Sequence, residues 1–210
     1  IHAPKGLEEI LKLQFKASHS YMSYPLIFHT LASSKSEMIL DNEKLTVETI
    51  PLDHRIYTNG FLFKAKVGDR KLLIDKVLDL NIDKAYYKSI VKGKDVETKD
   101  GELINNKDIT EDPKPALSYA FCSDTVYKED MVPQITRVTA LYHESTFLKS
   151  HEHLCERTKH STAAQAATIA LKAKVGTLIL GHYSSRYGDY ELFRTEAKEI
   201  FENTELAMDG

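Results

Sequence analysis

The sequence predicts a mixed α/β fold in which helices cover a β-sheet. Between residues 38 and 67, three consecutive stretches alternate apolar and polar residues, which is typical of antiparallel strands with one buried face. From residue 116 onward, apolar runs of strand length alternate with segments of helical periodicity, and this alternation indicates a layered α/β arrangement. The 210 residues fit a single domain.

The first third of the chain predicts one helix and then a meander of strands. The opening "IHAPKGLEEILKLQF" places a proline near the start of a stretch with apolar residues at helical spacing, so it indicates the end of a strand followed by a helix. Strands are expected from Met38 to Leu40, from Leu45 to Leu52 and from Gly60 to Val67.

Residues 68–112 differ from their surroundings and are expected to form an inserted arm outside the core. They are rich in Lys and Asp, with a short helical pattern from Ile74 to Leu80 and a turn at Gly101 within "TKDGELI". The stretch from Lys64 to Lys99 contains ten basic and six acidic residues, which gives it a local net charge of +4. Such a stretch is either a solvated surface of mixed charge or a patch that binds an anionic partner.

The second half predicts strands and helices in turn. We expect strands at 116–123, 140–144, 175–180 and 205–208, and helices at about 130–136, 161–174 and 190–201. The helix near residue 161 has the clearest start, because Thr162 and Gln165 fit a capping box ahead of an alanine-rich run.

Composition limits the classes of function. A net charge of −3 argues against a surface that is basic throughout, so nucleic acid would have to be bound by a local patch. Cys122 and Cys155 form no CxxC pair and are expected to be free thiols in a reducing compartment, the cytoplasm. No apolar run approaches the roughly 20 residues that span a bilayer, and no signal-peptide pattern is present, so we expect a protein with no membrane partner.

Polar side chains occur where predicted strands end. His54, Asp124, His143 with Glu144, and His182 each follow an apolar stretch. In layered α/β folds ligands bind beyond the strand ends, and His and Asp are residue types that bind zinc. Each residue also has a plain structural interpretation, because a histidine at a strand end is often simply hydrogen-bonded and Asp124 within "CSDT" could cap a helix.

His160 precedes the predicted helix N-terminus, where exposed backbone N–H groups favour an anion such as a phosphate. Sequence pattern alone therefore indicates a hydrolytic metal site only weakly.

Three segments of the chain, by their sequence, order and spacing, resemble ribonuclease Z, the tRNA 3′-processing endonuclease family of the metallo-β-lactamase superfamily. They are "ALYHESTF", "KHSTAAQAA" and "LILGHYSSRY". The superfamily's thioesterases and lactamases do not share this combination. The segments "PLDHRIYTNGFLF", "CSDT" and "GKDVETKDGELI" are similar to further parts of the family, so the resemblance extends from Pro4 to the end of the chain.

The resemblance implies an αββα sandwich and a zinc-dependent endoribonuclease. The enzyme would remove the 3′ trailer of precursor tRNA by attack of a metal-activated water and leave a 3′-hydroxyl end, with two zinc ions per subunit and a homodimeric assembly. In the family the arm clamps the tRNA elbow, often across a dimer.

The resemblance to ribonuclease Z also implies roles for individual residues. His54 and His182 would bind one zinc ion each and Asp124 would bridge both, with His160 as the catalytic histidine and Glu144 as its acidic partner. Phosphate groups would be held by Ser184 and Arg186. The arm residues expected to meet tRNA are Lys84, Tyr86, Tyr87 and Lys88.

Two departures from the family pattern lead to further expectations. The superfamily's His-x-His-x-Asp-His motif, which supplies most remaining metal ligands, does not occur in these 210 residues. The chain is therefore expected to lack the N-terminal portion of the sandwich and to be weakly active or inactive by itself, with reduced or absent zinc. In the arm, "NIDKAYYKS" replaces the Gly-Pro turn that is frequent in the family.

Two other functions stay open at this point. One is a metallo-β-lactamase-fold hydrolase of a small ester or phosphodiester, against which the arm and "HSTAA" argue. The other is a non-catalytic, metal-poor RNA-binding scaffold, which the absent ligand motif favours.

Overall fold

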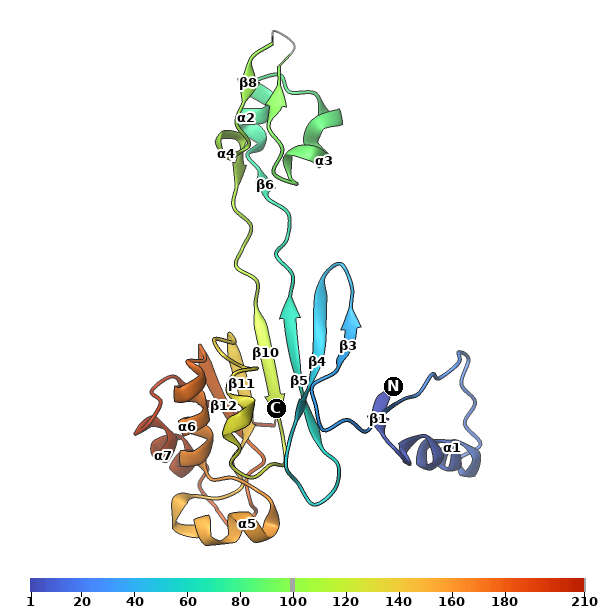
Figure 1. Cartoon of the computed structure of the whole chain (residues 1–210), viewed down its shortest axis with the longest axis vertical. Helices are drawn as coiled ribbons and strands as arrows, with labels where there is room; N and C mark the ends of the chain where they lie inside the picture. The colour runs from blue at the N-terminus through green and yellow to red at the C-terminus, as the bar shows by residue number, and fades with distance from the viewer. Residues whose placement is uncertain (99–100, 210) are drawn as a thin grey trace. The chain divides into compact units, whose positions relative to one another are not determined.

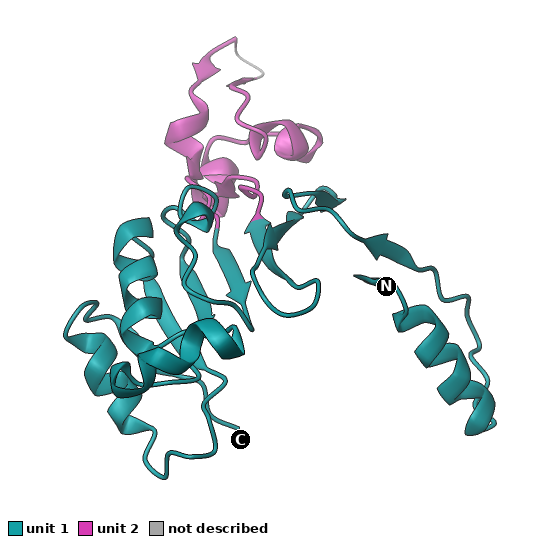
Figure 2. Cartoon of the chain, turned by 60° about the horizontal axis from the view of Figure 1, so that its bottom comes forward, with its two compact units in different colours: residues 1–64, 117–210 teal, residues 65–116 magenta. Residues whose placement is uncertain are grey.

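The computed structural model describes residues 1–98 and 101–209, and the chain divides into two compact units. One unit consists of residues 1–64 and 117–210, and the other of residues 65–116 (Figure 2). The expected arm, residues 68–112, lies within the second unit.

The first unit contains a mixed seven-stranded sheet (Figure 1). Its strand order is β13-β12-β11-β10-β5-β4-β3, in which β10 to β13 are parallel, while β5 pairs antiparallel with β10 and β3 with β4. The strands are β3 (Met38–Asp41), β4 (Leu45–Pro51), β5 (Asn59–Ala65), β10 (Ser118–Cys122), β11 (Ala140–Glu144), β12 (Thr177–Gly181) and β13 (Thr204–Leu206). The parallel strands alternate with helices, as the sequence pattern predicts.

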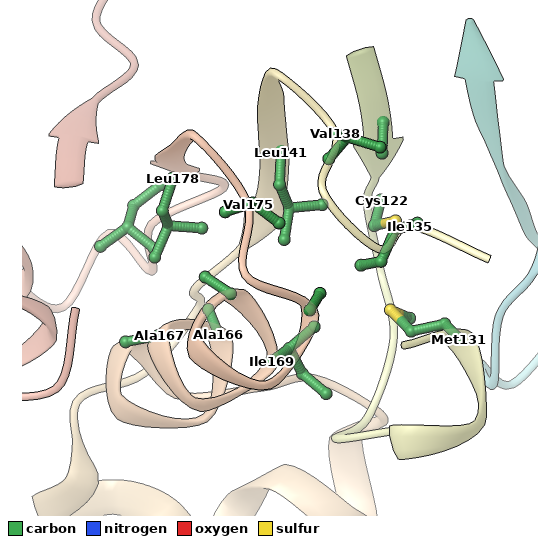
Figure 3. Packing of buried hydrophobic residues seen from close by; sticks show 14 of the residues in the cluster. Cys122, Met131, Ile135, Val138, Leu141, Ala166, Ala167, Ile169, Val175 and Leu178 are labelled. Carbon is green, nitrogen blue, oxygen red and sulfur yellow. The ribbon is translucent and has the colours of Figure 1, made fainter. Parts of the chain in front are cut away.

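Two helices pack against one face of the parallel strands (Figure 1): α6 (Ala163–Ala173) and α7 (Glu191–Lys198). The small side chains of α6 allow close approach to the sheet, where Ile169 and Ala166 lie with Leu141 and Leu178 in one buried cluster (Figure 3). The predicted capping box is present, because Thr162 accepts from the Gln165 N–H at 3.1 Å and Gln165 accepts from the Thr162 N–H at 3.0 Å.

The opposite face of the sheet carries aromatic rings. Phe121 stacks on Tyr142 with ring centroids 4.7 Å apart, and Phe63 stacks on Tyr119 at 6.2 Å. These side chains alternate along their strands with the fully buried residues of the helix-covered face, as the twofold period of a strand requires.

Further short elements complete the first unit. The expected first helix is α1 (Leu7–Ala17), and it lies between β1 (His2–Pro4) and β2 (His29–Leu31), which pair in parallel. Between β11 and α6 come η3 (Lys149–Leu154) and α5 (Cys155–Thr158).

The second unit has a small core of its own, formed by Val77, Ile82, Ile90, Val96 and Ile109. Its paired strands are β6 (Lys71–Leu72) with β9 (Thr110–Glu111) and β7 (Val96–Glu97) with β8 (Leu103–Ile104). Its helical segments are α2 (Ile74–Asp79), η1 (Lys84–Tyr86), α3 (Tyr87–Ile90) and α4 (Asn106–Ile109).

The structure differs from the sequence prediction in one helix. Residues 130–136 form only the short 3₁₀ segment η2 (Glu129–Met131) and turns, because Pro133 has no N–H to continue a helical ladder. The expected turn of "TKDGELI" passes through residues 99 and 100, which lie outside the described residues. In the described part of the chain, no helix has the length and apolar character needed to cross a bilayer.

Candidate metal and catalytic site

The polar residues after β10, β11 and β12 lie at one edge of the sheet. Parallel pairing aligns the strand ends, since Cys122 pairs with His143 and Glu144 with Gly181. Asp124 and His182 follow these ends directly, so the topology brings them to the same edge. His54 comes from the segment between β4 and β5, and His160 comes from the segment before α6.

Asp124 occupies the centre of this group, with each carboxylate oxygen facing a different histidine. Its Oδ1 lies 3.4 Å from Nε2 of His182, and its Oδ2 lies 3.9 Å from Nε2 of His54. The His160 ring is 5.1 Å from the rings of both His54 and His182, centroid to centroid. Donor atoms of Asp124, His160 and His182 all lie within 4.8 Å of one another.

The His54 ring is held in one orientation by a backbone carbonyl. Its Nδ1 lies 2.9 Å from the Lys159 oxygen, and because a carbonyl oxygen only accepts, Nδ1 must carry the hydrogen. In the neutral ring Nε2 then has a free lone pair on the side that faces Asp124. This is the form in which histidine binds metal ions.

Electrostatics keep Asp124 ionised. Burial alone would raise the pKa of its carboxyl, but the hydrogen bond from Ser123 at 2.7 Å and electrostatic interactions with His182, His160 and His54 outweigh burial. The pKa of Asp124 therefore lies below its ordinary value, and the side chain is a carboxylate suited to a cation.

His160 and Glu144 form a close pair beside this group. His160 Nδ1 donates to Glu144 Oε1 at 2.8 Å, and the Glu144 side chain is fully buried. The hydrogen bond with Glu144 raises the pKa of His160, although burial acts in the opposite direction. For Glu144, burial by itself would raise the pKa. The hydrogen bonds from His160 and from the Thr146 N–H outweigh burial, so the pKa of Glu144 is lowered.

Three residues at the site have left-handed backbone conformations, with φ of 25° at Asp124, 62° at Lys159 and 60° at His182. A non-glycine residue there costs about 1–2 kcal/mol. Such strain persists where surrounding contacts impose it, and it is concentrated at functional sites. Asp124 and His182 follow β10 and β12, and Lys159 follows α5, so each strained residue lies just after the end of an element.

Ser184 and Arg186 follow β12 and contact each other. The Arg186 Nε donates to Ser184 Oγ at 3.2 Å, and its guanidinium lies 5.1 Å from the centroid of the Phe147 ring. Phe147 in turn lies 6.4 Å from the His160 ring. The Phe147 ring thus contacts both the Arg186 guanidinium and the His160 ring.

Other residues named from the sequence lie elsewhere. His143, which also ends a predicted strand, is fully buried, and its Nδ1 donates to the Glu144 backbone oxygen at 2.7 Å. Burial lowers its pKa, so it is a neutral core residue. Lys84, Tyr86, Tyr87 and Lys88 belong to the second unit, where Tyr87 packs against the unit's core and the other three are exposed.

Sequence reasoning missed Thr146 and Lys159. Thr146 contacts both Glu144 and His182, whereas Lys159 acts through its carbonyl oxygen. The hydroxyl two residues after Glu144 is a signal that could have been noticed. A backbone contact between residues 105 positions apart has no sequence signature.

The donor set fits zinc. Imidazole nitrogens and one carboxylate are typical zinc ligands, and Nε2 of His54 and Nε2 of His182 each lie near a different oxygen of Asp124. The described residues at this edge offer three imidazoles and one carboxylate, which is sufficient for one metal with three protein ligands.

Comparison with solved structures shows the fold. Human tRNase Z, short form, matches all of this chain with a TM-score of 0.62 and 18% identity, and the match covers 64% of that chain. The metallo-β-lactamase fold protein YhfI from Bacillus subtilis gives a TM-score of 0.60 at 16% identity and 62% coverage of its chain. The predicted metallo-β-lactamase fold class is confirmed.

Sequence relatives show the family, although no protein-family model matches the chain. The chain is 39% identical over 210 residues to ribonuclease Z of Bacteroides fragilis, covering 69% of that protein. It is 42% identical over 213 residues to ribonuclease Z of Cytophaga hutchinsonii, covering 67% of that protein. The chain thus spans about two thirds of the length of these relatives, and it belongs to the ribonuclease Z family of endoribonucleases that process the 3′ ends of tRNA.

Proposed function

We propose that this chain carries the catalytic and substrate-binding residues of a zinc-dependent endoribonuclease that removes the 3′ trailer of precursor tRNA. The observation that carries the proposal is the convergence of His54, Asp124 and His182 beside the His160–Glu144 pair at one sheet edge. Together these groups offer a cation site next to a proton donor, which are the two requirements for hydrolysing a phosphodiester.

His54, Asp124 and His182 would hold the metal. Two zinc ions, one per histidine with Asp124 shared, would lower the pKa of a water molecule and neutralise charge on the phosphate. The two oxygens of Asp124 face different imidazoles, and this arrangement supports a bridging role.

His160 acts as the general acid. Its Nδ1 is engaged by Glu144, which leaves Nε2 to donate a proton to the 3′ oxygen that leaves the scissile phosphorus. The hydrogen bond with the buried Glu144 carboxylate raises the pKa of His160, which favours the imidazolium form that a general acid needs. The tRNA product then ends in a 3′-hydroxyl.

Ser184 and Arg186 bind the phosphate groups that flank the scissile bond. The Arg186 guanidinium supplies positive charge and several N–H donors, and its contact with Ser184 holds the two groups together. A serine hydroxyl donates one further hydrogen bond to a phosphate oxygen.

The second unit contributes to tRNA binding through exposed basic and aromatic side chains. Lys84 and Lys88 are exposed and lie four residues apart, and Tyr86 is 49% exposed between them. Lysines neutralise phosphates and an exposed ring stacks on an unpaired base. Tyr87 serves a different purpose, because its ring packs on the core that supports this surface.

The decisive experiment is cleavage of a precursor tRNA with a labelled trailer, with zinc added. The expected products are a tRNA with a 3′-hydroxyl end and an intact trailer, and Asp124→Asn should abolish them. Cleavage of a small phosphodiester with the precursor left intact would instead identify a general hydrolase.

A second candidate function has one observation in its favour. Among the described residues, the group around Asp124 offers three imidazoles and one carboxylate, which are fewer donors than two separate zinc ions need and are consistent with a non-catalytic RNA-binding chain. Tight precursor binding without zinc uptake or cleavage would support that function.

The expected oligomeric state rests on the resemblance to the family, and the expected compartment rests on the two cysteines. We expect a homodimer, which sedimentation analysis would test. Cys122 and Cys155 are buried and unpaired, which supports a cytoplasmic location.

A further inference from the structure

Thr146 lies between the two halves of the site. Its Oγ1 is 2.8 Å from Oε2 of Glu144 and 2.9 Å from Nδ1 of His182, and the residue is 7% exposed. One hydroxyl therefore touches the acidic partner of His160 and also a candidate metal ligand.

The direction of these hydrogen bonds follows from counting hydrogens. A threonine hydroxyl has one hydrogen, and the ionised carboxylate of Glu144 can only accept, so Thr146 donates to Glu144. The remaining lone pairs of Oγ1 accept from His182, whose Nδ1 must then carry the hydrogen. In the neutral ring this leaves Nε2 of His182 unprotonated, 3.4 Å from Asp124 Oδ1.

The hydroxyl is fixed in place from two sides. The Thr146 N–H donates to Glu144 Oε2 at 2.9 Å, and the Thr146 carbonyl accepts from the Ser184 N–H at 3.1 Å. The Ser145 N–H also donates to the Gly181 oxygen at 2.8 Å, so the loop after β11 is tied to the chain around His182. Because threonine is β-branched, its χ1 is restricted further.

We propose that Thr146 is a positioning residue that selects the Nδ1–H tautomer of His182 and joins this ligand to the His160–Glu144 pair through one chain of hydrogen bonds. Only the description of His182 as a metal ligand rests on the proposed function. The tautomer itself is a property of the metal-free protein.

Removing the hydroxyl should reverse the tautomer. In Thr146→Val the acceptor for Nδ1 is lost, and Asp124 Oδ1 becomes the acceptor nearest to the ring. The hydrogen then moves to Nε2, where it blocks the lone pair that a metal needs. Thr146→Ser keeps a hydroxyl at the same position and should behave as the wild type.

The test is a long-range proton–nitrogen correlation spectrum of the metal-free 210-residue chain, at a pH where the ring is neutral. The His182 signals are assigned by their loss in His182→Gln. We expect Nδ1–H in the wild type and in Thr146→Ser, and Nε2–H in Thr146→Val. An Nε2–H tautomer in the wild type, or an unchanged tautomer in Thr146→Val, would overturn the proposal.

Metal affinity provides the second measurement. Titration with zinc should show binding weakened about 10- to 100-fold in Thr146→Val and restored in Thr146→Ser. Thr168→Val makes the same chemical change within α6, where the hydroxyl donates to the Ala164 oxygen, and should leave affinity unchanged. Equal affinities in all variants would count against the proposal.

If Thr146→Val fails to fold, the wild type and Thr146→Ser still test the proposal, because an Nε2–H tautomer in either protein would overturn it. A chain that shows the expected tautomer but cleaves no precursor tRNA would refute the proposed function and leave the role of Thr146 standing.

Discussion

Glu144 and His160 are joined by a hydrogen bond of 2.8 Å, and the carboxylate is completely shielded from solvent. The pair unites the end of β11 with the segment before α6. It therefore places the His160 imidazole at the sheet edge where Asp124 and His182 also lie.

Glu144→Gln should lower the pKa of His160. The carboxylate is the main cause of the raised pKa, and without it the opposing effect of burial dominates. Histidine signals followed by NMR against pH in the metal-free chain measure the change. Because the general acid acts in its protonated form, the alkaline limb of the activity profile should move to lower pH in the variant. An unchanged His160 pKa would contradict the assigned pairing.

His160→Gln should reduce cleavage of precursor tRNA by about 10²–10⁴-fold, the usual contribution of general acid catalysis. Zinc content, measured on the purified protein, should stay at the wild-type level, whereas His182→Gln should lose zinc. A ring nitrogen of His160 also lies within 4.8 Å of possible ligand atoms of Asp124 and His182, so the three residues could hold one metal ion together. Equal loss of zinc in the two variants would therefore identify His160 as a ligand instead.

His182→Gly should be more stable than His182→Ala. Both changes remove the imidazole and its hydrogen bond to Thr146, but only alanine keeps a Cβ at a φ of 60°. We expect a difference in unfolding free energy of about 1 kcal/mol, less any loss from the greater freedom of glycine in the unfolded chain. Urea denaturation of the two metal-free variants measures it, and a more stable alanine variant would show that the backbone is relaxed there.

Replacing residues 65–116 by a short Gly-Ser turn should weaken binding of precursor tRNA and spare hydrolysis of a small phosphodiester. Lys64 and Ser118 are paired neighbours in β5 and β10, so the shortened chain can close as a hairpin without a change of register. Gel-shift and phosphodiesterase assays measure the two effects. Parallel loss of both activities would mean that the second unit also supports the catalytic site.

Lys84→Ala combined with Lys88→Ala should weaken tRNA binding and lower its salt dependence, by a slope of about 1 for each phosphate that is no longer neutralised. Both lysines are exposed on the second unit, so their charges are accessible to RNA. Lys71→Ala is the matched control, because Lys71 already pairs with Glu111 at 3.2 Å. A similar change of slope in the control would indicate a diffuse charge effect.

The sequence predicted the elements whose signals are local. The capping box of Thr162 and Gln165 marked α6, and apolar runs marked β10 to β12. The helix expected at 130–136 was wrong because Pro133 outweighed an otherwise helical pattern. The short strand pairs of the second unit were missed because two-residue strands carry almost no periodicity.

Residue types at strand ends indicated the candidate site, but its geometry depends on the fold. His143 and Glu144 are adjacent on β11, yet strand alternation sends the first imidazole into the core and leaves the carboxylate to meet His160. The roles of Thr146 and the Lys159 carbonyl depend on contacts between distant segments. Such contacts follow from the folded topology and not from any local pattern.

The wide separation of the site's donors along the chain has a consequence for biosynthesis. His54, Asp124 and His182 span 128 positions, and they meet only through pairing of strands that are remote in sequence. Contacts of such long range form late and slowly. The cation site that we propose can therefore form only after His182 has emerged from the ribosome and β12 has paired with β11, so metal binding would report that the sheet has assembled.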